Sequence, residues 1–548
     1  MYTIHSYDTR NPVAAAQAAG HQGDGAHHEH RHMAAETISE LLHERLTDSA
    51  DLTAIVDDEG ALTYAELEHR SAQIAAALLM RGVKKGDVVG ILMPNSANWA
   101  ATAYGVMRVG AVATPLSTLL RPRELQQQLA TAGVKTLILA EGHRKRDYRT
   151  DVAQLDRADL PLLTDIIWWS EFDYSASPDR EAVARAEAAV TPGDDMAIMF
   201  TSGSQGAPKG VIHTHGGAIR VTRDAAGPRC FRKGERVYLP MPFFWMGGFG
   251  AGMLAAMTTG AALVTEHSPE PSRTLRLLAR EGVTIFRGWP DQALQIARHP
   301  DFTSTDLSKL RSGSLEPLLP PELRSEPGRR SKLFGMTESF GPITGWALDE
   351  DMPESGWGSC GKALGAARLR IVDPETHAPL AANQAGSLHI SSPNLMRGIC
   401  GRDNKDVFTA DGWYDTGDLA TINEDGFLFF VGRRDDMFKV KGATVYPAEV
   451  EEALTSIPGV ERAIAIDIEV DGQKTVAVAV LLGEGVASDI DALAAQARER
   501  LSAFKLPTRW TVLGSIRDLP MLASGKLDKT AFRALVAAGR TPCKLKPG

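Results

Sequence analysis

The sequence predicts an α/β protein in which a large N-terminal domain of layered strands and helices precedes a small α+β domain. The chain has 548 residues, enough for two or more domains. From about residue 35, apolar strand-like runs alternate with helical runs, which is typical of mostly parallel sheets covered by helices. After Gly432-Arg433-Arg434-Asp435 the pattern changes to a shorter block. We therefore predict a disordered tail at 1–34, a large domain at 35–434 and a small domain at 435–548.

In the large domain, a helix is predicted from about residue 62 to 82, followed by the buried strand Val88–Met93, which Pro94-Asn95 ends. A second helix runs from about Trp99 to Val109. Further strands are expected at 111–115, 134–139, 197–201 and 284–286. In the small domain we expect helices at 448–454 and 489–501, and strands at 462–468 and 475–482.

Composition excludes several classes of protein. The net charge is −9, from 59 basic and 68 acidic residues, so nucleic acid is not an expected partner. The chain has four cysteines and no C-x-x-C pair, which argues against a disulfide framework or a cysteine-based zinc site. The N-terminal residues show no basic segment followed by an apolar core, so export is not expected. A cytoplasmic location fits these features.

One uncharged stretch, 237–265, is longer than the roughly 20 residues that cross a bilayer. Pro240, Pro242 and several glycines make a continuous helix unfavourable, so we favour a buried strand, loop and helix over a membrane span. In the tail, His28-Glu29-His30-Arg31-His32 matches the zinc motif H-E-x-x-H. No amphipathic helix or third ligand accompanies it, so we interpret it as part of a His-rich tail that could still bind metal adventitiously.

The segment Phe200–Gly210, which directly follows an apolar strand, has the composition of a phosphate-binding loop. Its hydroxyls and glycines allow backbone N–H groups to converge on anionic oxygens, and Lys209 adds a positive charge. It is not a Walker A loop, because Pro208 occupies the position of the second glycine. Taken alone, the segment could also be an ordinary surface turn.

Further motifs follow in a fixed order: Phe334-Gly335-Met336-Thr337-Glu338, Asp411-Gly412-Trp413-Tyr414-Asp415-Thr416-Gly417-Asp418, Gly432-Arg433-Arg434-Asp435, Lys439-Val440-Lys441-Gly442, and Leu519-Pro520-Met521-Leu522-Ala523-Ser524-Gly525-Lys526. With these motifs the sequence resembles the acyl-adenylate-forming superfamily, which contains acyl-CoA synthetases, luciferases and non-ribosomal adenylation domains. The resemblance covers roughly residues 35 to 540, and it is greatest to acyl- or aryl-CoA synthetases.

The resemblance implies an ATP-dependent ligase that joins a carboxylic acid to AMP, releases pyrophosphate, and passes the acyl group to the thiol of coenzyme A. It implies that Thr337 contacts the α-phosphate, that Glu338 binds Mg²⁺, and that Lys526 bridges the acid and the nucleotide. Asp418, assisted by Arg433, is expected to bind the ribose. The remaining nucleotide contacts that it implies are Thr201, Ser202, Gly203, Ser204, Gln205, Gly206, Lys209, Ser314, Phe334, Gly335 and Met336.

The resemblance also implies that the small domain rotates about a hinge at Asp435 between the two steps, so that a loop around Gly442 replaces Lys526 in the active site. Lys439 and Lys441 are candidates for thioester formation or for contacts with cofactor phosphates, although both could lie on a solvated strand face. Several positions depart from the family pattern, among them serines at the family's Glu and Gly positions within Gly386–Pro393. Ser204-Gln205 replaces the usual pair of threonines, and Trp245 replaces the histidine common in CoA-forming members.

The expected acyl pocket is apolar. Segment 243–247 has no acidic residue to pair with an amine, so we expect an uncharged hydrophobic acid: fatty, aryl or polycyclic. Glycines are expected to leave space in it, although its apolar residues could simply fill the core. The residues predicted to form this pocket are Phe244, Trp245, Met246, Gly247, Gly248, Gly288 and Gly313.

Two alternatives remain open within and outside this class. The acyl group could go to a carrier-protein phosphopantetheine, or the enzyme could stop at acyl-AMP. The chain could instead be a non-catalytic nucleotide-binding regulator. Homodimer formation is possible.

Overall fold

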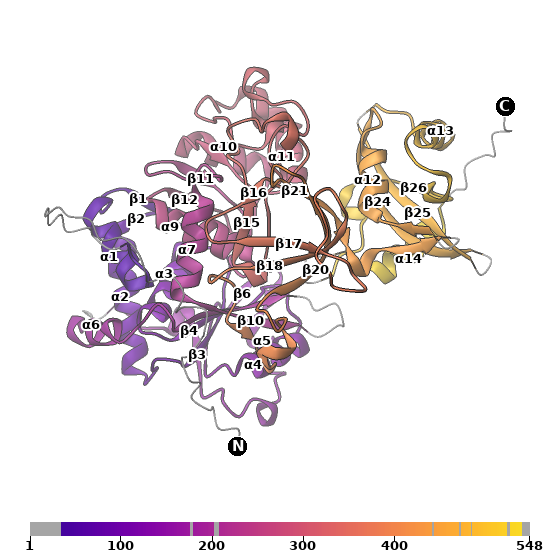
Figure 1. Ribbon diagram of the computed structural model, residues 1–548. Helices are drawn as coiled ribbons and strands as arrows, with labels where there is room; N and C mark the ends of the chain where they lie inside the picture. The colour runs from indigo at the N-terminus through magenta and orange to yellow at the C-terminus, as the bar shows by residue number, and fades with distance from the viewer. Residues whose placement is uncertain are drawn as a thin grey trace, which may run out of the picture. The chain divides into compact units, whose positions relative to one another are not determined.

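The computed structural model describes residues 34–175, 179–201, 208–440, 443–470, 473–483, 485–522 and 527–539. The chain divides into two compact units, Met1–Ala35 and Glu36–Gly548. Residues 1–33 of the predicted tail, with the His28–His32 motif, lie outside the described residues. The second unit has the predicted α/β architecture (Figure 1).

A seven-stranded sheet carries the phosphate-loop segment. Its strand order is β19-β10-β9-β4-β3-β5-β8. The pairs from β9 to β8 are parallel, and β10 pairs antiparallel with both β9 and β19. The predictions at 88–93, 111–115, 134–139 and 197–201 are confirmed. The bounds are β3 (Val88–Leu92), β4 (Val112–Pro115), β5 (Thr136–Leu139), β8 (Asp165–Trp168), β9 (Asp195–Thr201), β10 (Lys209–Thr214) and β19 (Gly398–Ile399).

A second sheet, of order β13-β11-β12-β1-β2, contains the uncharged stretch. Residues 237–265 form a buried strand, a loop and short helices, as predicted, and no described helix is long and apolar enough to cross a membrane. The bounds are β1 (Thr53–Val56), β2 (Ala61–Thr63), β11 (Arg236–Tyr238), α8 (Met246–Gly248), the π-helix η4 (Phe249–Leu254), α9 (Ala255–Thr259), β12 (Ala262–Val264) and β13 (Ile285–Phe286).

Helices around these sheets begin where the sequence provides caps. Thr37 with Glu40, and Thr63 with Glu66, form capping boxes at the starts of α1 and α2. The predicted helices at 62–82 and 99–109 are α2 (Tyr64–Met80) and α3 (Ala97–Arg108). The others are α1 (Ile38–Asp48), α4 (Pro122–Ala132), α5 (Tyr148–Val152), α6 (Arg180–Ala188), α7 (His215–Ala226), α10 (Pro271–Glu281) and α11 (Pro290–Ala297), with a small hairpin β6 (Gly142–His143) and β7 (Arg146–Asp147).

Two antiparallel sheets carry the remaining large-domain motifs, and the sequence analysis did not predict their strands. One has the order β17-β18-β20-β21 and the other β14-β15-β16. The bounds are β14 (Phe334–Met336), β15 (Gly341–Gly345), β16 (Lys362–Ala363), β17 (Arg368–Val372), β18 (Gly386–Ser391), β20 (Tyr414–Ile422) and β21 (Leu428–Arg433).

The C-terminal segment forms the predicted α+β arrangement, with sheet β24-β25-β26 between helices (orange to yellow in Figure 1). Val476, Val478 and Val480 are fully buried in its core beside Trp510. The predicted helices and strands are confirmed, and β26 is additional. The bounds are β22 (Phe438–Val440), β23 (Ala443–Val445), α12 (Pro447–Thr455), β24 (Val460–Val470), β25 (Gln473–Leu482), α13 (Ile490–Arg500), β26 (Arg509–Leu513) and α14 (Lys529–Ala537).

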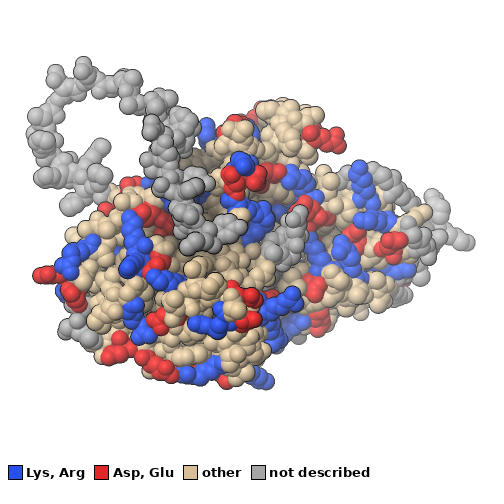
Figure 2. Space-filling model, turned by 90° about the horizontal axis from the view of Figure 1, so that it is seen from below, with Lys and Arg blue, Asp and Glu red and all other residues tan. Residues whose placement is uncertain are grey.

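The face drawn in Figure 2 carries basic and acidic side chains intermixed rather than one continuous charge. A pocket that binds an anion must therefore rely on a few local cations and oriented donors.

Candidate active site

The phosphate-loop segment is held at both ends by a β-hairpin. β9 ends at Thr201 and β10 begins at Lys209, and these two residues pair directly across the strands. Gly210 permits close packing, because a Cβ there would lie 2.9 Å from Cys400 Sγ. The predicted contacts from Ser202 to Gly206 lie outside the described residues.

A 3₁₀ turn, η8 (Thr337–Ser339), presents Thr337 and Glu338. Ser339 Oγ accepts from the Met336 N–H at 3.0 Å and donates to the Gly341 carbonyl at 2.7 Å, which fixes the turn. A Cβ on Gly335 would lie 2.2 Å from the Gly341 oxygen, so only glycine fits at that position.

The turn also packs against the hairpin. Phe340, which has a left-handed φ of 57°, contacts the His213 ring of β10 edge-on, with ring centroids 4.9 Å apart. His213 is buried, and burial lowers its pKa to about 3. A neutral, apolar contact therefore connects the two phosphate-side motifs.

Tyr414 holds the predicted metal ligand. Its hydroxyl donates to Glu338 Oε1 at 3.0 Å. Burial and the neighbouring carboxylate raise the pKa of Tyr414, so the phenol keeps its proton and acts as the donor. Tyr414 belongs to one of the sequence motifs, but no local pattern connects it to a carboxylate 76 residues away, so its role could not be predicted from sequence.

Asp418 and Arg433 face each other across β20 and β21. Arg433 Nη1 donates to Asp418 Oδ1 at 2.9 Å and to the Thr416 carbonyl at 3.0 Å. Burial raises the pKa of Asp418, and the Arg433 charge opposes that shift. The sequence had indicated this pair, and the structure brings it together.

These motifs, far apart in the sequence, line one pocket of about 1100 Å³, which is ample for a nucleotide. Seven predicted residues contribute to it, together with residues that were not predicted. The predicted ones are Thr201, Lys209, Met336, Thr337, Glu338, Arg433 and Asp435, and the others include Tyr414, Asp415, Thr416, Gly417, Arg434 and Asp436.

Other predicted residues have separate surroundings. Ser314 Oγ accepts from the Phe286 N–H at 3.0 Å, a contact within the fold. Phe334 lies against Phe430, with ring centroids 6.0 Å apart. Lys439 is exposed on β22. The predicted residues Lys441, Gly442 and Lys526 lie outside the described residues.

On the acyl side, Phe244 and Trp245 line a pocket of about 220 Å³ together with Trp289. The expectation that nearby glycines leave open space is wrong. A Cβ on Gly248 would lie 2.1 Å from the Pro242 carbonyl oxygen, and one on Gly247 would lie 2.6 Å from a methionine sulfur. These glycines therefore allow the backbone of the 243–250 segment to pack closely.

The surroundings of two other glycines predicted for the acyl pocket show what a side chain would meet at each position. Gly313 has a φ of 97° and its Cβ position is 2.9 Å from Cys230 Sγ, so any side chain would be strained. Gly288 faces the Oε1 of Gln292, the end of a flexible side chain.

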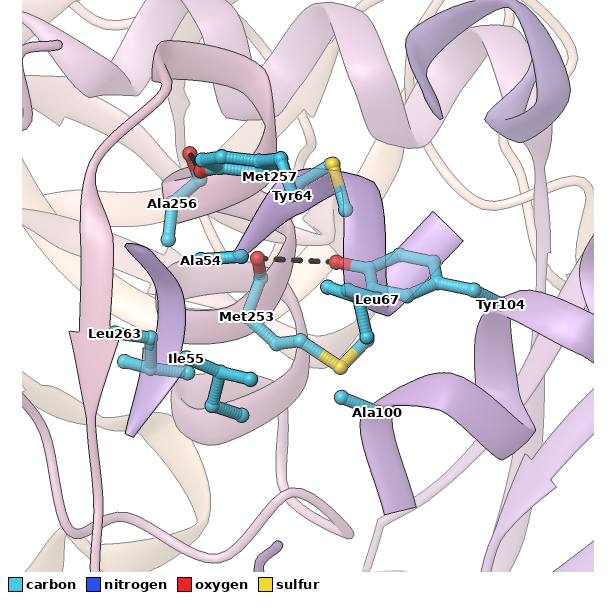
Figure 3. A pocket seen from close by; sticks show the side chains of 10 residues that line it. All are labelled: Ala54, Ile55, Tyr64, Leu67, Ala100, Tyr104, Met253, Ala256, Met257 and Leu263. Atoms are coloured by element: carbon cyan, nitrogen blue, oxygen red, sulfur yellow. Dashed lines mark hydrogen bonds between the residues drawn. The ribbon is translucent and has the colours of Figure 1, made fainter. Parts of the chain in front are cut away.

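Figure 3 shows a different cavity, in the apolar core of the large domain. It has a volume of about 10 Å³, room for about one water molecule. The hydroxyls of its two tyrosines already donate to carbonyls, Tyr104 to Met253 and Tyr64 to Ala256 and Ala261. We interpret it as a packing defect rather than a binding site.

The donor set fits Mg²⁺ bound together with a nucleotide. No cluster of three or more His, Cys, Asp or Glu residues suited to a metal occurs among the described residues. Mg²⁺ is commonly held by one or two carboxylates together with substrate phosphates and water, and Glu338 at the pocket wall can supply one.

The fold is that of adenylate-forming enzymes. A crystal structure of an anthranilate CoA ligase with anthranoyl-AMP matches with a TM-score of 0.76 at 22% identity, covering 91% of this chain and 97% of that one. The model of the AMP-binding enzyme family matches residues 42–400, and the model of the AMP-binding enzyme C-terminal domain matches residues 449–526. The chain belongs to the AMP-binding enzyme family.

Curated relatives match over nearly their whole length. A 3-(7a-methyl-1,5-dioxo-octahydro-inden-4-yl)propanoyl:CoA ligase of Mycobacterium tuberculosis is 30% identical, with 91% of this chain and 99% of the relative covered. A feruloyl-CoA synthase of Amycolatopsis sp is 31% identical, with 88% and 96% covered.

Proposed function

We propose that this AMP-binding enzyme activates a hydrophobic carboxylic acid of medium or bulky size. It is an ATP-dependent acyl-CoA synthetase, an acid–thiol ligase, as its curated relatives are. The observation that supports the chemistry is the single pocket that gathers Thr337, Glu338, Lys209 and Arg433. The proposal that the acid is hydrophobic is supported by the aromatic side chains of the 243–250 segment. It is also supported by the relatives, which act on a bicyclic propanoyl acid and on ferulate.

In the first step a carboxylate oxygen attacks the α-phosphorus, forms the acyl–phosphate bond and displaces pyrophosphate. Negative charge accumulates on the phosphoryl oxygens, so Thr337 donates to the α-phosphate and Lys209 neutralises the departing phosphates. Glu338 would hold Mg²⁺, which would supply further charge neutralisation. The Asp418–Arg433 pair holds the ribose, because a carboxylate accepts hydrogen bonds from both hydroxyls of a vicinal diol.

In the second step the CoA thiolate attacks the acyl carbonyl, a thioester bond forms, and AMP leaves. Lys526 acts in the first step only, and the small domain turns about Asp435 to bring the segment of Lys439, Lys441 and Gly442 to the site. The enzyme works in the cytoplasm, and it can form a homodimer.

The activity is tested with ATP, Mg²⁺, CoA and a panel of carboxylic acids, with acyl-AMP and acyl-CoA measured by mass spectrometry. We expect hydrophobic acids to form both products. Activity with amino acids alone would refute the proposed acid.

Lys526→Ala tests whether Lys526 acts in adenylation but not in thioester formation. We expect it to abolish adenylation, with a loss of about 10²- to 10³-fold or more, while sparing conversion of supplied acyl-AMP to thioester. Lys474→Ala, an exposed lysine on β25, is the matched control. Equal loss of both steps in Lys526→Ala would contradict the two-state assignment.

A further inference from the structure

Arg229, three residues after α7, is a half-buried arginine without an acidic partner among the described residues. Its Nε is buried and has no hydrogen-bond partner. Its guanidinium carbon lies 5.4 Å from the centroid of the Phe231 ring. Burial, together with the charge of Arg287, lowers the pKa of Arg229 to about 9, so it remains charged at neutral pH. A buried guanidinium N–H normally has an acceptor, because leaving it unpaired is costly.

Arg287 adds positive charge to the same region. Its Nη2 donates to the main-chain oxygen of Arg229 at 3.1 Å, and its own Nε is buried without a partner. The carboxylate that acts on Arg287 is Asp349, which also bonds Arg232 at 2.8 Å and Arg311 at 3.4 Å. The arginines around Asp349 therefore outnumber the carboxylates beside them.

Arg229 also lines a cavity of about 10 Å³, room for one oxygen-sized group. Thr222 also lines the cavity, but its Oγ1 already donates to the Ala218 carbonyl at 2.7 Å. Arg229 is therefore the lining side chain that could donate a hydrogen bond to a group in the cavity. The other walls are apolar: Val221, Ala225, Gly250, Ala251, Ala255, Phe340 and Pro342.

This cavity adjoins the segment assigned to the acyl group. Gly250 belongs to the 243–250 segment, and Phe340 lies two residues after Glu338. Met246 packs against the same glycine, since a Cβ on Gly250 would lie 2.8 Å from Met246 Sδ. A methionine side chain is flexible and can be displaced at small cost.

We propose that Arg229 is a specificity-determining residue that binds an oxygen acceptor, a ketone or a second carboxylate, at the far end of the acid. This inference rests on the proposed function, because it requires a hydrophobic acid beside the 243–250 segment. The acid displaces the Met246 side chain, its carbon skeleton lies against the apolar walls, and one oxygen occupies the cavity. An acid that lacks this oxygen leaves the buried Nε–H of Arg229 unpaired, and such sites discriminate strongly against it.

The test uses two series of acids matched in length. The aliphatic series is decanoic acid, its analogue with a ketone next to the terminal carbon, and decanedioic acid. The aryl series is phenylpropanoic acid with its para-acetyl and para-carboxyl derivatives. For each acid, kcat/KM of acyl-CoA formation is measured with the wild type and with Arg229→Met, Arg229→Lys and the control Arg276→Met, an exposed arginine of α10.

We expect the wild type to prefer an oxygenated acid in at least one series. Arg229→Met should lower the ratio of oxygenated to parent acid by about tenfold to a hundredfold, while its activity with the parent acid and its melting temperature stay near those of the control. Arg229→Lys should retain part of the preference if the acceptor is a carboxylate, and the better of the ketone and diacid identifies the oxygen.

Two outcomes overturn the inference and leave the proposed function intact: a wild type that prefers the parent acids, or a ratio that Arg229→Met does not change. The first would mean that the cavity holds only water. Formation of no acyl-AMP from any acid in either series would instead refute the proposed hydrophobic acid, and this inference with it.

Discussion

Replacing Tyr414 with Phe tests how the predicted metal ligand is held. The change removes one hydroxyl, which donates to the buried Glu338 carboxylate at 3.0 Å. The ring remains, together with its edge contact to Phe408 at 6.1 Å between centroids, so the packing is preserved. The variant therefore isolates the hydrogen bond.

A hydrogen bond to a charged group contributes about 1.5–3 kcal/mol, which corresponds to roughly 10- to 150-fold in an equilibrium constant. Partners that orient a metal ligand typically change metal affinity by about 10- to 100-fold. We therefore expect Tyr414→Phe to raise the Mg²⁺ concentration that half-saturates adenylation by about tenfold or more, while saturating Mg²⁺ restores much of the rate.

The assay is pyrophosphate release at a fixed excess of ATP and acid, with Mg²⁺ varied. Tyr148→Phe is the matched control, because its buried hydroxyl donates to the neutral Thr118 carbonyl at 3.1 Å, outside the pocket lining. An unchanged Mg²⁺ dependence in Tyr414→Phe, whatever happens to the rate, would show that this hydrogen bond does not position a metal ligand.

Three other changes have expected outcomes. Burial lowers the pKa of His213 to about 3 and of His215 to about 4, so below pH 6.5 these histidines take up protons in the unfolded state before they do so in the folded state. Each histidine should therefore lower the free energy of unfolding by about 1.4 kcal/mol at pH 5.5, relative to neutral pH. Urea titration measures this free energy, and a value that does not change from pH 7.5 to 5.5 would contradict the prediction. Gly335→Ala should abolish adenylation and lower the melting temperature, because its Cβ would meet the Gly341 oxygen at 2.2 Å; normal adenylation in this variant would show that the turn can rearrange. Asp418→Asn should weaken ATP binding by about tenfold or more in an equilibrium dialysis assay, and unchanged affinity would remove Asp418 from the ribose site.

Local sequence patterns predicted strands β3, β4, β5 and β9 and helices α2, α3, α12 and α13, because continuous apolar runs such as 88–93 are distinctive. The helices α1, α4–α7, α10 and α11 were not predicted. The antiparallel strands β14–β18, β20 and β21 were not predicted, since their residues follow no regular alternation of buried and exposed positions; all six residues of β18 are buried. Motif order singled out Thr337, Glu338, Asp418 and Arg433. Three of them line the large pocket and Arg433 bonds Asp418, while their roles stay predictions.

What local patterns could not show were contacts between distant residues. The Tyr414–Glu338 hydrogen bond depends on how two sheets pack. The close approach of Gly248 to the Pro242 carbonyl depends on the path of the backbone. The sequence suggested that this glycine leaves open space, but the neighbouring backbone occupies that space. An arginine such as Arg229 is ordinarily a surface residue, and nothing beside it in the sequence indicates burial.

The π-helix at Phe249–Leu254 overlaps the end of the 243–250 segment, which is proposed to contact the acid, and a deletion there would change that segment's conformation. A π-helix contains an extra residue relative to an α-helix, and such insertions often occur at functional sites. Deleting one residue from 249–254 would restore α-helical pairing and turn the preceding Met246–Gly248 by about 100° relative to α9. In evolution or in design, a single-codon deletion would therefore redirect Met246 and the adjoining Phe244 and Trp245, which line the pocket of about 220 Å³, and leave the nucleotide motifs unchanged in sequence.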